Sequence, residues 1–314
     1  MPDSRREPSP SYHPSPRPAS LRLPPGACDA HCHVFGPASR FPFDAESPFR
    51  PADAPKEKLF ALHAMLGLER CVIVQSTCHG FDNSVVADAI AAKKGAYCGI
   101  ALVPASVSDS SLAELHTQGF RGVRFNFMKH LGPSIPIEPI IALTSRLARL
   151  GWNLQVHFDS SLIDDLAPML LRSAVPVVID HMARIDAALG MDQPAFRSLR
   201  RLMADSRFWV KVSGSDRMSR LGPPYSDAVP FARTLVAEFG ARTLWGTDWP
   251  HPNSNGVPDD GELVDLLLEI APTEAARRAL LVDNPQRLYG FPVPLADATS
   301  ARVAPQSPRL PPGP

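Results

Sequence analysis

Short β-rich runs and segments with helical apolar spacing alternate eight times along this chain, and that alternation is its strongest constraint on the fold. The expected strands span residues 27–34, 71–77, 97–103, 122–127, 153–158, 175–181, 208–214 and 243–249, and an expected helix follows each of them. Nearly continuous apolar strands separated by amphipathic helices indicate parallel pairing with right-handed crossovers. Eight such units predict an α/β fold, a parallel eight-stranded (β/α)₈ TIM barrel. A doubly wound open sheet is the alternative, but it would be expected to carry a glycine-rich phosphate turn where this chain has HCHVFGP.

Proline marks the expected limits of the barrel. Eight of the 35 prolines fall in residues 1–25 and seven in residues 291–314, and both segments lack apolar periodicity. Such a composition buries too little apolar surface to offset the entropy of ordering, so we expect two disordered tails. Residues 26–290 are then the barrel domain, which is a typical length for this fold.

Charge and composition exclude several classes of partner. Lys plus Arg equals Asp plus Glu, at 32 each, so no net field attracts nucleic acid or an anionic membrane. No apolar run approaches the roughly 18 residues of a membrane span, and no signal-peptide pattern begins the chain. The five cysteines include no CxxC pair and are expected to be reduced thiols. We therefore expect a cytoplasmic protein with a small-molecule partner; its oligomeric state is not set by the sequence.

Ionisable side chains gather where the expected strands end, which is where TIM barrels carry their chemistry. His31 and His33 alternate at the end of the first strand, so both should point to one face with Cys32 opposite. The other members of the set are His157, His181 and Asp248, at the ends of the fifth, sixth and eighth strands. Each histidine alone could simply bond a backbone carbonyl. Together, four imidazoles and a carboxylate at one mouth predict a functional site.

Two arginines are expected beside this set. Arg124 lies inside the fourth strand, where a buried guanidinium needs an anionic ligand or an internal salt bridge. Arg217 follows the seventh strand and could equally be a solvated loop residue. Thr77 could be only a strand terminator, and Asp180 is expected to point away from His181 in a structural role.

Seven segments spread along the chain resemble a known family: DAHCHVFGP, VIVQSTCHGFDN, RGVRFNF, VVIDHMAR, LWGTDWPHPN, PDDG and LLVDNPQRLYG. They are similar to the 2-pyrone-4,6-dicarboxylate lactonase branch of the amidohydrolase superfamily, over about residues 26–290. The resemblance implies a (β/α)₈ hydrolase that opens a dicarboxylated pyrone lactone in the breakdown of aromatic compounds.

The resemblance also implies residue roles. Asp248 would be the general base that activates water. The groups that polarise the lactone carbonyl would be His31, His33 and His181. Arg124 and Arg217 would clamp the substrate carboxylates, and Thr77 would be a further substrate contact. These roles agree with the chemistry of the side chains, since a guanidinium binds a carboxylate through two parallel hydrogen bonds.

Three positions depart from the pattern of that branch. Phe49 and His157 stand where it has tyrosines, and His130 stands where it has an arginine. We keep Phe49 and His130 as candidate substrate contacts, although the substrate could differ. His157 restores a histidine that related amidohydrolases use for a divalent metal. Zinc or manganese is then expected on His31, His33, His157 and Asp248, with a metal-independent mechanism as the alternative.

The leading prediction is therefore a lactonase in which water, activated by Asp248, attacks a carboxylated lactone such as 2-pyrone-4,6-dicarboxylate or a close analogue. A metal-dependent decarboxylase of the same superfamily is the first alternative, because it would share the histidines and the aspartate. A noncatalytic barrel that binds small acids is the second. A pure binder has no need of both a base and an electrophile, which argues against it.

Overall fold

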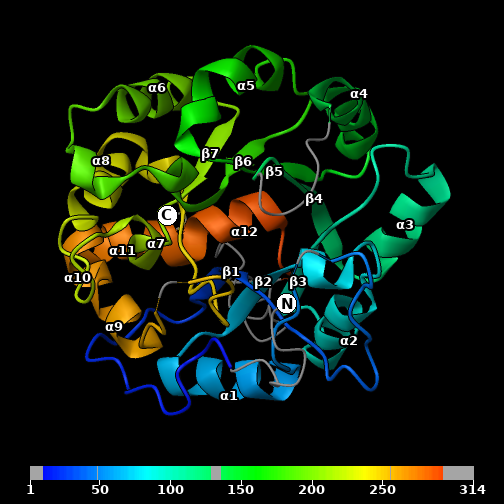
Figure 1. Cartoon of the computed structure of the whole chain (residues 1–314), viewed down its shortest axis with the longest axis horizontal. Coiled ribbons are helices and arrows are strands. Elements are labelled where there is room, and N and C mark those ends of the chain that lie inside the picture. The colour runs from blue at the N-terminus through cyan, green and yellow to red at the C-terminus, as the bar shows by residue number, and fades with distance from the viewer. Residues whose placement is uncertain (1–9, 48, 129–135, 255, 293–314) are drawn as a thin grey trace, which may run out of the picture.

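The computed structural model describes residues 10–47, 49–128, 136–254 and 256–292, and within them one parallel sheet runs in the order β1 to β8. The strands are β1 (Cys28–Cys32), β2 (Arg70–Val74), β3 (Tyr97–Ala101), β4 (Phe120–Asn126), β5 (Asn153–His157), β6 (Val177–Ile179), β7 (Phe208–Lys211) and β8 (Thr243–Leu244). Every neighbouring pair from β1–β2 to β7–β8 is parallel. The sheet curls into a barrel with helices around its outside (Figure 1), and the predicted (β/α)₈ TIM-barrel fold is confirmed.

The barrel closes between β1 and the segment that follows β8. Ala30 N donates to Trp245 O at 2.9 Å, and Asp248 N donates to the carbonyl of His31 at 2.8 Å. This contact requires a glycine between them, because a Cβ on Gly246 would lie 2.3 Å from the backbone nitrogen of His31. The GTDW segment is therefore drawn tightly against the HxH strand, and the two parts of the site are fixed to each other.

The described residues form twelve α-helices, most of which lie around the outside of the sheet. They are α1 (Lys56–Leu66), α2 (Ser84–Ala92), α3 (Asp109–Thr117), α4 (Ile137–Ala148), α5 (Ile163–Leu170), α6 (Pro194–Met203), α7 (Ser215–Met218), α8 (Val229–Phe239), α9 (Asp260–Asp265), α10 (Leu267–Ile270), α11 (Glu274–Arg278) and α12 (Asn284–Tyr289). The longer helices bury one face on the strands. In α6, for example, Phe196, Leu199 and Met203 are buried at helical spacing while Arg200 and Arg201 are exposed. The expected helix after the eighth strand is divided into α9 and α10.

The amino-terminal end of the barrel interior is closed by α12 and the residues just after it. In Figure 1, α12 lies across the middle of the barrel. Tyr289 and Phe291 are buried among apolar side chains from β1, β2, β3 and β7, including Cys28, Val72 and Trp209. The tail expected from residue 291 was therefore set too early, because Phe291 belongs to the core. Residues 293–314 lie outside the described residues.

The N-terminal segment also differs from its expected disorder. Residues 10–25 lie against the barrel, and the expectation was wrong for them; residues 1–9 lie outside the described part of the chain. The Tyr12 ring packs on Trp249 with centroids 5.2 Å apart, and Leu21 packs against the core. Asp265 on α9 accepts hydrogen bonds from the backbone nitrogens of Ser20 and Leu21, each at 2.8 Å. Composition could not predict this order, because residues 10–25 are held by hydrogen bonds from their backbone to carboxylates and by only a few apolar side chains.

Two other properties bear on the sequence expectations. All five cysteines are buried free thiols, as expected. Among the described residues, none of the helices combines the length and the apolar character needed to cross a bilayer.

Candidate active site

The HxH pair of β1 enters the site as its alternation predicts. His31 and His33 both point into the mouth of the barrel, while Cys32 points outward, with its Sγ 3.1 Å from that of Cys71. The register of β1 against β2 shifts between Asp29 and Cys32. Asp29 faces outward, where it bonds His63 of α1 and the hydroxyl of Thr247. One buried carboxylate therefore ties the HxH strand to the GTDW segment.

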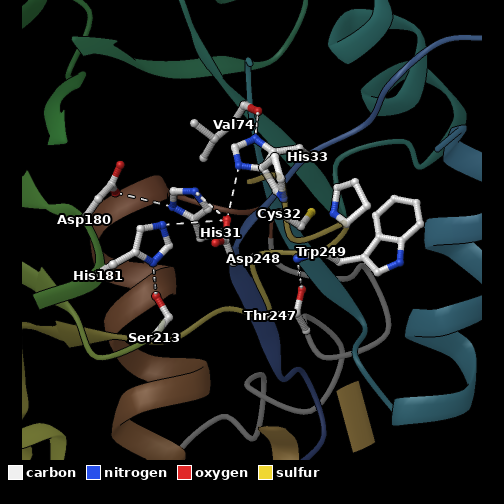
Figure 2. Close-up of polar contacts among 12 residues, drawn as sticks. His31, Cys32, His33, Val74, Asp180, His181, Ser213, Thr247, Asp248 and Trp249 are labelled. Atoms are coloured by element: carbon white, nitrogen blue, oxygen red, sulfur yellow. Dashed lines mark hydrogen bonds and ion pairs between the residues drawn. The ribbon is translucent and has the colours of Figure 1, made fainter. Parts of the chain in front are cut away.

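Asp248 is the point on which three imidazoles converge (Figure 2). Its Oδ1 lies 3.6 Å from His31 Nε2, 3.3 Å from His33 Nε2 and 3.7 Å from His181 Nε2. Its Oδ2 accepts a hydrogen bond from the Nε of Arg217. Burial raises the pKa of this carboxyl, but Arg217 and the histidines outweigh burial and hold the pKa well below its usual value. Asp248 is therefore an ionised carboxylate able to accept a proton.

Each of these imidazoles has its other ring nitrogen fixed by a different partner. His33 Nδ1 lies 2.7 Å from the carbonyl of Val74, and His181 Nδ1 lies 3.0 Å from Ser213 Oγ. His31 Nδ1 lies 2.7 Å from Lys211 Nζ. Burial, together with the charge of Lys211, lowers the pKa of His31 to about 3. The His31 ring is consequently neutral at physiological pH.

Asp180 lies in the barrel interior, and the expectation that it would point away from His181 was wrong. β6 ends at Ile179, and His181 takes a left-handed backbone conformation with φ 47°, so the alternation of a strand does not continue through this pair. Asp180 Oδ2 accepts a hydrogen bond from Arg124 Nε at 2.8 Å, and its Oδ1 lies 2.9 Å from Lys211 Nζ. Burial raises its pKa, but these two cations hold the pKa well below the usual value. Asp180 thus links two strands of the site.

A cavity of about 260 Å³ opens above these groups. Its lining brings together predicted residues from seven of the eight strands or the loops that follow them: His33, Phe49, Thr77, Arg124, His157, His181, Arg217 and Asp248. Arg124 forms the internal salt bridge considered for it, with Asp180, and its side chain also lines the cavity. Arg217 is buried beside Asp248, which excludes the solvated-loop interpretation. His130 lies outside the described residues.

Sequence reasoning missed two charged residues of the site region. Arg184 lines the cavity as a third guanidinium, and Lys211 forms a buried ion pair with Asp180. A lysine inside the apolar run FWVKVSG was the available signal, because an unpaired lysine there would be costly. The strand pattern could not predict Arg184 as a site residue, because β6 ends at Ile179 and four residues separate that end from Arg184.

His157 ends β5 and lines the cavity, but the structure does not group it with the other predicted metal ligands. Donor atoms of His31, His33 and Asp248 lie within 4.8 Å of one another, and His157 is not part of that group. Its Nδ1 instead lies 3.2 Å from Asn126 Oδ1, and its ring centroid is 5.8 Å from that of His181. Burial, reinforced by Arg124, holds the pKa of His157 well below its usual value. His157 is therefore a neutral side chain that lines the cavity beside His181.

The barrel, the HxH strand and the aspartate after β8 define a class, and the comparison with known proteins agrees with it. The amidohydrolase family model matches residues 28–291, and the chain belongs to this family.

Curated relatives make the similarity more specific. The 2-pyrone-4,6-dicarboxylate hydrolase of Comamonas testosteroni is 44% identical over 288 residues, which is 88% of this chain and 94% of the relative. The 4-sulfomuconolactone hydrolase of Hydrogenophaga intermedia is 41% identical, covering 87% and 91% of the two chains. A solved structure from Agrobacterium tumefaciens is 29% identical with a TM-score of 0.77, covering 88% of this chain and 99% of that one.

Proposed function

We propose that this protein is a hydrolase that opens a lactone carrying acidic substituents, 2-pyrone-4,6-dicarboxylate or a close analogue, in the breakdown of aromatic compounds. The observation that carries the proposal is an ionised, buried Asp248 surrounded by three imidazoles below an arginine-lined cavity. Two curated relatives named as lactone hydrolases support it. Such a site supplies both a base and hydrogen-bond donors for a carbonyl oxygen, which a simple binding site does not need.

The reaction follows from this arrangement. Asp248 accepts a proton from a water molecule while the water oxygen forms a bond to the lactone carbonyl carbon. The carbonyl π electrons move to the oxygen, where imidazole N–H donors of the histidine cluster stabilise the charge. When the tetrahedral centre collapses, the ring C–O bond breaks. The leaving oxygen takes the proton held by Asp248, with His181 assisting the transfer, so the product is an open-chain acid.

The arginines explain why the substrate should be anionic. Arg124, Arg184 and Arg217 face one small cavity. Arg124 and Arg217 each have a carboxylate partner, but Arg184 has none among the described residues, so an anionic substituent bound between these groups would be favourable. A guanidinium donates two parallel hydrogen bonds to the two oxygens of a carboxylate, and it can donate to two oxygens of a sulfonate in the same way. Thr77 contributes a hydroxyl to the lining. Phe49 lines it without a hydroxyl, so one substrate contact would be made by packing alone.

A divalent metal was the other expectation, and members of this superfamily often use one. His31, His33 and Asp248 lie close enough together to be considered as ligands. However, the cationic Lys211 bonds His31 and Arg217 bonds Asp248, so two of the three donors already face buried cations. His157, the proposed fourth ligand, has no partner at Nε2 among the described residues, but it is not part of the group of donor atoms formed by the other three. The donor set does not fit a zinc or manganese site of His31, His33, His157 and Asp248, and we propose a reaction that these side chains carry out by themselves.

Elemental analysis tests that proposal directly. Protein produced in medium supplemented with zinc and manganese should contain less than about a tenth of an equivalent of either, and chelators should leave its activity intact. A stoichiometric metal that chelation removes together with activity would overturn it. If the wild-type protein does contain a metal, its content is also measured in His157→Tyr. An unchanged content would exclude His157 as a ligand, whereas loss of the ion would restore it as one.

A substrate panel tests the function itself. Dicarboxylated, monocarboxylated and sulfonated lactones are incubated with the protein, and ring opening is followed by absorbance while carbon dioxide is measured in parallel. Ring opening of acidic lactones, lost in Asp248→Asn, is the expected result. Carbon dioxide release without ring opening would support the decarboxylase alternative. Saturable binding of the acids with no turnover would support the noncatalytic barrel.

A further inference from the structure

Lys211 is a completely buried lysine that the reaction described above does not use directly. It ends β7, and its side chain points into the barrel interior below the cavity. Its Nζ lies 2.7 Å from His31 Nδ1, 2.6 Å from Gln155 Oε1 and 2.9 Å from Asp180 Oδ1. An ammonium has three N–H donors and no acceptor. The contacts with His31 and Gln155 are hydrogen bonds, and the contact with Asp180 is a buried ion pair.

Two of these three partners, Asp180 and Gln155, can only accept from Lys211 and cannot donate to it. Asp180 is a carboxylate that also accepts from Arg124. The orientation of Gln155 is set by its Nε2, which donates to Asn153 Oδ1 at 3.3 Å and to the Tyr289 hydroxyl at 3.2 Å, leaving Oε1 toward Lys211. Burial lowers the pKa of Lys211, whereas the ion pair with Asp180 at 2.9 Å favours the ammonium form, which then donates to His31 Nδ1 at 2.7 Å.

A neutral imidazole that accepts at Nδ1 must carry its own hydrogen at Nε2. That Nε2 is fully buried and has no hydrogen-bond partner among the described residues. Asp248 Oδ1, at 3.6 Å, is beyond normal hydrogen-bond length. The result is an N–H donor at the base of the site that is fixed in direction and unsatisfied.

We propose that Lys211 is a positioning residue that holds His31 as the Nε2–H tautomer, so that His31 donates a hydrogen bond and does not bind a metal. The acceptor for this N–H is the lactone carbonyl oxygen as it becomes negatively charged, and this assignment rests on the proposed function. Asp180 adds a link to substrate binding, because the same carboxylate holds both Lys211 and Arg124. The donor and one wall of the anion-binding cavity are therefore positioned by a single buried group.

Nuclear magnetic resonance tests the tautomer without any substrate. In protein labelled with ¹³C and ¹⁵N only at histidine, the His31 resonances are assigned by their loss in His31→Asn. The ring carbon and nitrogen shifts of His31 in the wild-type protein should be those of the Nε2–H form. Shifts of the Nδ1–H form would overturn the proposal, because His31 would then donate from Nδ1 to Asp180 Oδ1, 3.4 Å away, or to a neutral Lys211. This measurement decides the question even if a Lys211 variant does not fold.

Kinetics of Lys211→Met separate positioning from a purely structural role. Loss of one preoriented donor to an oxyanion should lower kcat about 100- to 1,000-fold. KM should change less than about threefold, since Arg124 and Arg217 remain. The His31 shifts should move toward a mixture of tautomers. Lys56→Met is the matched control, because Lys56 pairs with Asp88 far from the cavity; it should leave kcat and the His31 shifts unchanged.

Two outcomes of this variant would contradict the proposal. One is a folded Lys211→Met protein with unchanged His31 shifts. The other is a lower melting temperature with wild-type kcat, which would make Lys211 structural only. If no lactone is hydrolysed by the wild-type protein, the proposed function fails, whereas the tautomer measurement still stands by itself.

Discussion

At the amino-terminal end of the strands the barrel interior is filled by apolar side chains, whereas at the carboxyl end it is filled by ionisable ones. Cys28, Val72 and Trp209 pack with Tyr289 at the first end. His31, Asp180 and Lys211 contact one another at the second. Both sets are buried and both come from the same strands, often only two or three residues apart.

The two ends of the barrel have different roles: the amino-terminal end stabilises the fold, and the carboxyl end carries the groups of the candidate active site. Apolar burial contributes about 25 cal/mol per Å² and makes no demand on partners. Buried charges cost several kcal/mol each unless they are paired, and here Arg124, Lys211 and Arg217 each have a carboxylate partner. The carboxyl end is therefore held in one arrangement by its ion pairs while the amino end stabilises the fold. Substitutions at the two ends should accordingly have opposite signatures.

The largest expected effect is that of Asp248→Asn. The amide cannot accept the proton of the attacking water, so kcat should fall by about 10²- to 10⁴-fold, while the protein still folds. Turnover and melting temperature are measured together. Asp88→Asn, at a peripheral ion pair, is the control and should retain full activity. Near-normal turnover in Asp248→Asn would remove this residue as the base.

At the opposite end, Tyr289→Ala should affect stability. Removing a buried aromatic side chain should lower the free energy of unfolding by about 3–5 kcal/mol, measured by denaturant titration, with kcat of the folded fraction nearly retained. Tyr289→Phe keeps the ring and loses only the hydroxyl that accepts from Gln155, and it should cost about 1 kcal/mol. A large loss of kcat without loss of stability would break the division between the two ends.

Arg124→Met should act mainly on substrate binding. Loss of a charged hydrogen-bond donor is worth about 1.5–3 kcal/mol, so KM for acidic lactones should rise about 10- to 100-fold. Arg146→Met is a matched control, because Arg146 pairs with Asp109 on the outside of the barrel. If KM is unchanged and only the melting temperature falls, the role of Arg124 is limited to its buried ion pair with Asp180, and it does not bind the substrate.

The smallest effect is expected for Tyr12→Ala in the N-terminal segment. Tyr12 packs on Trp249, the residue after Asp248, and an aromatic pair of this kind contributes about 0.5–1.5 kcal/mol. A decrease of that size in the free energy of unfolding is expected, with little change in kcat. Arg17→Ala removes an exposed ion pair and should cost less than 1 kcal/mol. No measurable effect of Tyr12→Ala would show that the contact does not contribute.

Much of the site could be predicted because strand alternation is a local property. His31 and His33 share a face because side chains two residues apart in a strand always do. His181 and Asp248 follow strands whose carboxyl ends meet at one mouth, so their proximity follows from the barrel. The same rule failed at Asp180, because the backbone leaves the strand conformation at His181.

The sequence by itself determined the barrel, since eight repeats of strand and helix bury their apolar faces in only a few arrangements, and it determined which strand ends carry chemistry. The tertiary structure decided what those groups bind. Lys211 and His31 are 180 residues apart, and no local pattern states that one will bond the other. Nor could composition show that residues 10–25 would dock on α9. The hydrogen bond of a buried polar group depends on which acceptor the fold brings within about 3 Å, and that is a property of the assembled chain.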